Sequence, residues 1–406
     1  MRTKQFTTSA KRGWALLGPG IITAALVFGP GSLTITSKMG ASFGFSMFWV
    51  IALSVFFMIS YTEMGVRIGM ASKNTLLTDI RNRWGKPAAI VIGIGIFLVT
   101  SSFQAGNTIG AGLAFSELFG TSTIPWVIFF TALGISLLFF NSFYKVLEKI
   151  MLVMVGLMLT SFFITLVLAK PNLSNIIKGL IPSIPVGSEM LAIALIASSF
   201  SMVAVFYQAY LVKEKGWKKE ELVKSRRESL SGILILGLIS SFILINAACI
   251  LHPQGIEVKS AADMGLALEP LFGKSTSVIF MIGMFGASFS SLVGNATIGG
   301  ALFADAFSWG NQLDSKNVKG LIMLVMIMGA LIALYFGGLP LELIVFAQAI
   351  TVLIAPIIGI ALLLIANDNK IMGVMKNGTS KNITNGLGLL LLLFLLGSYI
   401  FLLLFK

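Results

Sequence analysis

The residues best suited to bind a ligand interrupt the first apolar stretch, where Gly29, Pro30, Gly31 and Ser32 follow one another. Proline removes a backbone donor and glycine weakens the helical ladder, so a transmembrane helix breaks there. Lipid cannot satisfy the freed backbone groups, and such a break therefore has to line a cavity inside protein. The N–H groups of the helix that follows suit a small anion, a carboxylate or a zwitterion. The alternative interpretation is a structural kink without a ligand.

Three further side chains are candidates to line the same cavity. The serine-rich segment 198–201 predicts a second, weaker break, because serine bends a helix less than proline does. Its Ser199 hydroxyl, the Met202 sulfur and the Gln348 amide complete a predicted site that holds no charged group. For Met202, packing within an apolar helix is the competing interpretation.

Two pairs of polar residues are candidates for gating or coupling. Gln104 and Asn107 are three residues apart on one predicted helix, and hydrogen bonding between helices is the alternative. Glu63 and Arg67 have the spacing of a helical ion pair, so a structural pair near the end of a span competes with a gating role. No predicted span carries a nucleophile with a base, or paired carboxylates, so we expect neither an enzyme nor a cofactor.

The composition places these residues in a membrane. Of 406 residues, 56% are apolar and only 11% are charged, which indicates a polytopic membrane protein. The formal net charge of +13 comes from basic residues in short loops, so membrane topology explains it better than a nucleic-acid partner. The single Cys249 excludes an internal disulfide framework.

Hydropathy predicts eleven membrane-spanning helices, the first of them broken. They lie near residues 14–38, 45–70, 87–116, 124–141, 146–169, 188–212, 230–251, 275–306, 319–337, 341–366 and 386–405. Lys and Arg gather in alternate loops, above all between Lys213 and Arg227. This bias predicts a protein of the cytoplasmic membrane with its N-terminus in the cytoplasm and its C-terminus outside.

The odd number of spans predicts two five-helix halves and one extra helix. Within a single transmembrane domain over 1–406, the halves cover 13–170 and 186–366, and the extra helix covers 385–406. Two halves of opposite topology form the inverted repeat of many secondary transporters, whose substrates bind at broken helices. The expected fold is therefore an all-α polytopic membrane protein with broken first and sixth spans.

The chain resembles the Nramp family of metal-ion transporters over nearly its whole length. The resemblance rests on segments that share the family's order and spacing: Gly18-Pro19-Gly20 ahead of the turn at Gly29–Gly31, Glu63–Gly69, Asp79–Arg81, Tyr144–Glu148, Asn246–His252, Leu268–Gly273, Gly286–Gly300, Gln348 and Asn367–Gly373. It implies the broken-helix inverted repeat of sodium-coupled amino-acid symporters, alternating access, and a divalent metal ion as the solute.

At the family's metal-binding positions this chain differs. The family's first break reads Asp-Pro-Gly-Asn, and here Gly29 and Ser32 stand in place of the acid and the amide. The family's sixth span carries Met-Pro-His, and here the segment reads Met202, Val203 and Ala204. The resemblance therefore implies a kept methionine but a lost carboxylate and a lost histidine.

The family's two proton-route acids in the third span align with Gln104 and Asn107, whereas its tenth-span glutamine is kept as Gln348. Proton coupling needs titratable groups within the membrane, so we expect it to be weak or absent. By resemblance the solute is Mg²⁺ or Mn²⁺, bound in part by Met202 and Gln348, and a neutral site favours a largely hydrated Mg²⁺.

Two other hypotheses remain open from the residues themselves. A carrier of a small anion, carboxylate or zwitterion would use the break at Gly29–Ser32, and a non-transporting sensor would keep only the scaffold. The expected partners are a small solute or a divalent metal ion, and membrane lipid. No nucleic acid is expected, and a monomer is compatible with the sequence.

Overall fold

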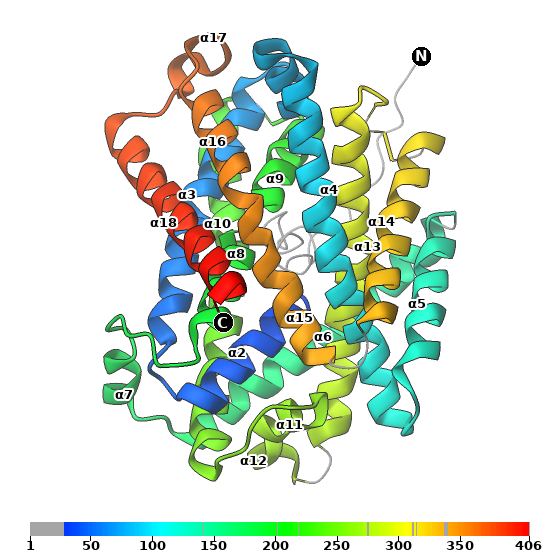
Figure 1. Ribbon diagram of the computed structural model, residues 1–406, viewed down its shortest axis with the longest axis vertical. Coiled ribbons are helices and arrows are strands. Elements are labelled where there is room, and N and C mark those ends of the chain that lie inside the picture. Colours follow the sequence, from blue (N-terminus) through cyan, green and yellow to red (C-terminus); the bar gives the residue numbers. More distant parts are fainter. Residues whose placement is uncertain are drawn as a thin grey trace.

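A computed structural model of the protein describes residues 28–139, 141–200, 202–217, 219–273, 276–310, 312–313, 315–336 and 340–405. Within these residues the chain forms a bundle of long helices that stand side by side (Figure 1). The short helix α17 (Asn369–Met372) lies at one end, and α7 (Leu173–Lys178), α11 (Ala261–Gly265) and α12 (Glu269–Phe272) lie at the opposite end.

The long helices follow the predicted spans. They are α2 (Pro30–Phe43), α3 (Phe48–Ala71), α4 (Leu76–Phe119), α5 (Thr123–Leu137), α6 (Asn141–Ala169), α8 (Glu189–Phe200), α9 (Met202–Glu214), α10 (Leu222–Ile250), α13 (Thr276–Ala306), α14 (Lys316–Tyr335), α15 (Pro340–Ala349), α16 (Ala355–Ala366) and α18 (Thr379–Phe405). In the described part of the chain, seven helices are long and apolar enough to cross a membrane, or eight when the bent pair α15–α16 is one span. The protein is thus a polytopic membrane protein built from helices.

The remaining predicted spans coincide with shorter elements. The helix α5 (Thr123–Leu137) and the segment Val155–Ala169 of α6 are apolar but shorter than 18 residues, and α2 has 14 residues. The N-terminal half of the first predicted span, 14–27, lies outside the described residues. Of the second predicted break, 198–201, the first three residues belong to the end of α8, and Ser201 lies outside the described residues. The segment as a whole is one apolar stretch, Glu189–Lys213.

The helices α4 and α13 pack closely along their length and form one wall of the interior. A Cβ atom added at Gly93 of α4 would lie 2.2 Å from Cβ of Ala306, and one added at Gly299 of α13 would lie 2.3 Å from Oγ1 of Thr100. Such distances are far below van der Waals contact, so small residues are required for the two backbones to approach.

Two bends modify the predicted spans. The helix α4 begins at Leu76 rather than near residue 87, and it is interrupted at Gly85, whose φ of 86° favours glycine, just before Pro87. In the tenth span, Pro340–Leu353 and Ala355–Ala366 meet at 42°. A short 3₁₀ turn over Ile350–Leu353 precedes this second bend, and Pro356 lacks the N–H that would continue the ladder.

Candidate substrate site

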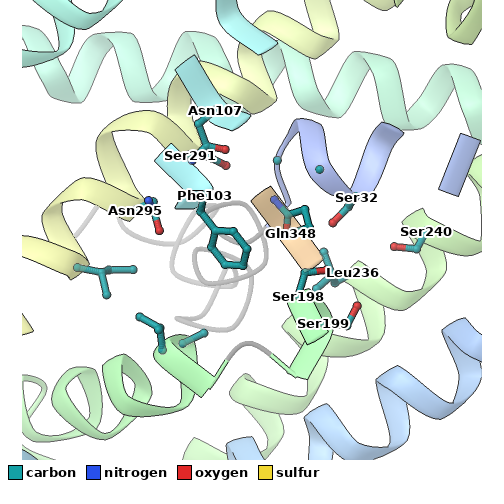
Figure 2. A pocket seen from close by; sticks show the side chains of 15 residues that line it. Ser32, Phe103, Asn107, Ser198, Ser199, Leu236, Ser240, Ser291, Asn295 and Gln348 are labelled. Atoms are coloured by element: carbon teal, nitrogen blue, oxygen red, sulfur yellow. The ribbon is translucent and has the colours of Figure 1, made fainter. Parts of the chain in front are cut away.

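A cavity of about 60 Å³ lies where α2, α4, α8, α9, α10, α13 and α15 meet (Figure 2). Its lining consists of Gly29, Gly31, Ser32, Phe103, Asn107, Ser198, Ser199, Val203, Ala204, Leu236, Ser240, Ser291, Asn295, Ile298 and Gln348. A cavity needs roughly 10–15 Å³ to hold one water molecule, so this one is large enough for more than one. Amides and hydroxyls supply all the polar side chains of this lining, so the described wall of the cavity is electrically neutral.

The start of α2 forms one side of the cavity. Gly29 has an extended backbone (φ −126°, ψ −174°), Pro30 is the first helical residue, and the N–H of Leu33 donates to the carbonyl of Gly29 at 3.4 Å. By helical geometry the N–H groups of Gly31 and Ser32 have no partner within α2. The helix begins about halfway along the bundle, so its positive end faces the interior (Figure 1).

Pro30 itself faces away from this lining and packs on α4. A Cβ atom added at Gly110 would lie 2.6 Å from Cβ of Pro30. The proline therefore fixes the direction in which α2 starts, whereas its neighbours Gly29, Gly31 and Ser32 line the cavity.

Gln348 lies directly against Gly31. A Cβ atom added at Gly31 would come within 2.3 Å of Nε2 and 2.4 Å of Cδ of Gln348. The absence of a side chain at Gly31 is what allows the amide to lie on the first turn of α2. Gln348 thereby connects the start of α2 with α15, just before the bend of the tenth span, where the hydroxyl of Thr351 donates to its carbonyl at 2.7 Å.

The helix α13 supplies two polar lining residues that the sequence analysis missed, Ser291 and Asn295. The Ser291 hydroxyl donates to the carbonyl of Phe28 at 3.1 Å. Nδ2 of Asn295 donates to the carbonyl of Thr100 at 2.7 Å and to Oε1 of Gln104 at 3.2 Å. The four-residue spacing of Ser291 and Asn295 on one helical face was the available signal.

The other candidates of the third and sixth spans occupy different places. Asn107 and Ser199 line the cavity. Gln104 is fully buried behind Asn295, and its Nε2 has no hydrogen-bond partner among the described residues. Met202 is 3% exposed and lines a second, smaller pocket. Phe103 lines both pockets and lies between them.

Glu63 and Arg67 lie near the α17 end, away from the cavity, and here the expected helical pair is corrected. Glu63 pairs with Lys381 of α18 at 2.6 Å and with Arg226 of α10 at 3.3 Å. The Arg67 guanidinium donates instead to the Met375 carbonyl at 2.9 Å and to Oδ1 of Asn377 at 2.7 Å. Partners from distant segments have displaced the local i, i+4 contact.

The side chains that line the cavity can recognise a ligand through neutral dipoles. In the described part of the chain, no group of three or more His, Cys, Asp or Glu residues is placed to hold a metal ion. Amide and hydroxyl oxygens can bind a hard cation weakly, or bind the water molecules that surround it.

Comparisons with known proteins agree with this architecture. The model of the family described as natural resistance-associated macrophage protein-like (Nramp) matches residues 20–403. A relative from Pectobacterium carotovorum, named divalent metal cation transporter MntH, is 24% identical over 378 residues, which cover 91% of this chain and 90% of the relative. A protein of the same name from Chromohalobacter salexigens is 26% identical over 390 residues, covering 92% and 89%.

A solved structure has the same fold. The crystal structure of a mutant of the Eremococcus coleocola manganese transporter superposes with a TM-score of 0.73 at 17% identity, covering 96% of this chain and 87% of that one. The fold class predicted from the sequence is thereby confirmed.

Proposed function

The chain belongs to the Nramp family, and from this membership we propose that it carries a divalent metal cation across the membrane as a secondary transporter. Relatives named as divalent metal cation transporters align with about nine tenths of the chain, which supports this class of solute. The observation that carries the proposal is the cavity at the start of α2. Secondary transporters bind their substrates beside helices that are interrupted within the bundle, and α2 begins there.

Among divalent cations, we propose Mg²⁺ rather than Mn²⁺ as the preferred ion. Mg²⁺ gives up its water reluctantly and usually keeps several water molecules when bound. The cavity is large enough for more than one water molecule and offers amide and hydroxyl groups that can bind them. The soft Met202 sulfur, which would favour a transition metal, lies in the second pocket.

We also propose that proton coupling is weak or absent. Asn107 and Ala204 line the cavity and cannot titrate, and Gln104 behind the wall cannot either. Glu63 is held by Lys381 and Arg226 near the α17 end. A proton route through the described cavity wall would therefore have no acid to use.

We also propose how the protein is oriented in the membrane. Loops rich in Lys and Arg, such as that between α9 and α10, would face the cytoplasm of a plasma-membrane carrier. The α17 end would then be the cytoplasmic end, and alternating access would require the contacts there to open and close.

One observation favours a second candidate, a carrier of a small anion or zwitterion. The N–H groups of Gly31 and Ser32 belong to the first turn of α2, and both residues line a cavity whose described wall has no negative charge. The positive end of a helix in such a setting stabilises an anion.

Uptake into proteoliposomes separates the two candidates. We expect Mg²⁺ uptake that is competed by Mn²⁺, is indifferent to an imposed pH gradient, and is lost in Gln348→Ala. The matched control is Gln254→Ala, because Gln254 is an exposed glutamine in the 3₁₀ turn His252–Gln254 that follows α10. Uptake of bicarbonate or a small carboxylate that is insensitive to metal chelators would instead establish the second candidate.

A further inference from the structure

Side chains of two other helices lie close to Gly29. A Cβ atom added at Gly29 would lie 3.0 Å from Oδ1 of Asn107 and 3.3 Å from Oγ of Ser291. The extended backbone of Gly29 is one that any residue adopts, so the obstacle to a side chain here is space. Oxygen atoms of α4 and α13 thus lie in tight contact with the position of a Cβ atom at residue 29, and at least one of them would have to shift by a few tenths of an ångström to admit a side chain.

Asn107 is the member of this pair that is available to a ligand. Ser291 is engaged with the Phe28 carbonyl, and Asn295 holds Thr100 and Gln104. Asn107 lines the cavity at 4% exposure, and its side chain forms no hydrogen bond with any residue that the structure describes. Figure 2 shows Asn107 beside Ser291 on the side of the cavity that faces the start of α2. An unpaired buried amide costs free energy unless a ligand or water binds it.

We propose that Asn107 determines which cation binds, because its amide oxygen supplies from α4 the ligand that Gly29, which has no side chain, does not supply. This inference rests on the proposed function, since it assumes a divalent cation in the cavity. A carboxylate at position 107 then creates a Mn²⁺ site, whereas a carboxylate at position 29 gains less affinity, because Asn107 or Ser291 first has to move aside for it.

The Asn107→Asp substitution is suited to the test because it changes charge without changing shape. The carboxylate would occupy the volume of the amide, so overpacking is avoided. Carboxylates bind divalent cations more strongly than neutral oxygens do. Gly29→Asp, in contrast, places its side chain in tight contact with Asn107 and Ser291, and the double variant Gly29→Asp with Asn107→Ala relieves one of these contacts.

The experiment is Mn²⁺ binding to the purified full-length protein, followed by the electron paramagnetic resonance signal of free Mn²⁺. We expect the Kd of Asn107→Asp to be roughly tenfold lower than that of the wild type, equivalent to 1.4 kcal/mol. Gly29→Asp should change Kd by less than about threefold, and the double variant should bind more tightly than Gly29→Asp.

The matched control is Ser240→Asp, which adds the same charge to the cavity from α10, away from Asn107 (Figure 2). If Ser240→Asp and Asn107→Asp lowered the Kd for Mn²⁺ equally, the proposal would be overturned, because a carboxylate elsewhere in the cavity would then have the same effect. A Gly29→Asp variant that binds Mn²⁺ as tightly as Asn107→Asp would also overturn it.

A second variant keeps the proposal testable if Asn107→Asp fails to fold. Asn107→Leu is apolar and similar in size, and it should abolish the thermal stabilisation that Mg²⁺ gives the wild type. Unchanged stabilisation by Mg²⁺ in Asn107→Leu would refute the role of Asn107 and leave the proposed function standing. A wild type that transports anions and no metal would refute the proposed function itself, and this inference with it.

Discussion

The cavity and the α17 end differ in the polar side chains that they contain. The cavity wall presents neutral groups such as Asn107 and Gln348. The α17 end carries the cluster formed by Glu63, Lys381 and Arg226, which joins α3, α18 and α10. The charged side chains of the α17 end therefore form ion pairs between helices, whereas the cavity in which a solute would bind is lined by neutral polar groups.

Other charged groups reinforce this contrast. Arg83 pairs with Asp368, and the Tyr210 hydroxyl donates to Asp305 at the end of α13. Removing one partner of such a contact leaves a partly buried charge without compensation, whereas a neutral dipole can exchange its partner for water at small cost. Under the proposed function, the neutral cavity would determine which solute binds, and the charged α17 end would influence the conformational equilibrium.

We expect the largest loss of transport when Gly31, which lies in the cavity, is replaced by a bulky residue. In Gly31→Leu the new side chain has to displace the amide of Gln348 and fill the start of α2, because even a Cβ atom would lie 2.3 Å from Nε2. We expect Mg²⁺ uptake into proteoliposomes to fall by roughly tenfold or more. The control is Gly156→Leu, since Gly156 lies on the exposed side of α6 with open space around it. Normal uptake in Gly31→Leu would place the solute elsewhere.

An intermediate effect is expected for Glu63→Gln, which removes the charge shared by Lys381 and Arg226. The cationic partners are roughly half exposed, so the free energy of unfolding should fall by only about 1 kcal/mol. Thermal unfolding should detect this loss, while the Kd for Mg²⁺ should stay within about twofold because the cavity is untouched.

The control for this variant is Glu257→Gln. Glu257 pairs with Lys259 at 2.7 Å, but both side chains are exposed, and no change in stability is expected. Loss of Mg²⁺ binding in Glu63→Gln would contradict the division between the two regions, because a charge near the α17 end would then be a determinant of affinity.

The smallest effect is expected at Met202. Because its side chain lines the second pocket, Met202→Leu conserves volume and should change the Kd for Mg²⁺ by less than about twofold. Isothermal titration of the purified variant measures this directly. A large loss of metal affinity would instead make the sulfur a ligand and bring the two pockets into one site.

Local sequence signals predicted much of this architecture. The apolar spans and the start of α2 follow from hydropathy and from the conformational limits of glycine and proline, which depend on a few neighbouring residues. The bend between α15 and α16 had a weaker signal in Pro356, because proline is tolerated within transmembrane helices and does not always bend them.

Tertiary partners could not be predicted in the same way. The spacing of Glu63 and Arg67 suggested a helical pair, but spacing contains no information on Lys381 and Arg226, which reach Glu63 from other helices. Ser291 lies in a helix with small and polar residues on several faces, so its orientation toward the cavity depends on packing against α4.

The most direct test of the central claim is a thermal-shift screen of the purified protein with Mg²⁺, Mn²⁺, bicarbonate, small carboxylates and amino acids. A ligand at 100 times its Kd adds about 2.7 kcal/mol to the free energy of unfolding. We predict such stabilisation by Mg²⁺, smaller stabilisation by Mn²⁺ at the same concentration, and loss of both in Gln348→Ala. Stabilisation by an anion or a zwitterion alone would contradict the account and assign the neutral cavity to a different solute.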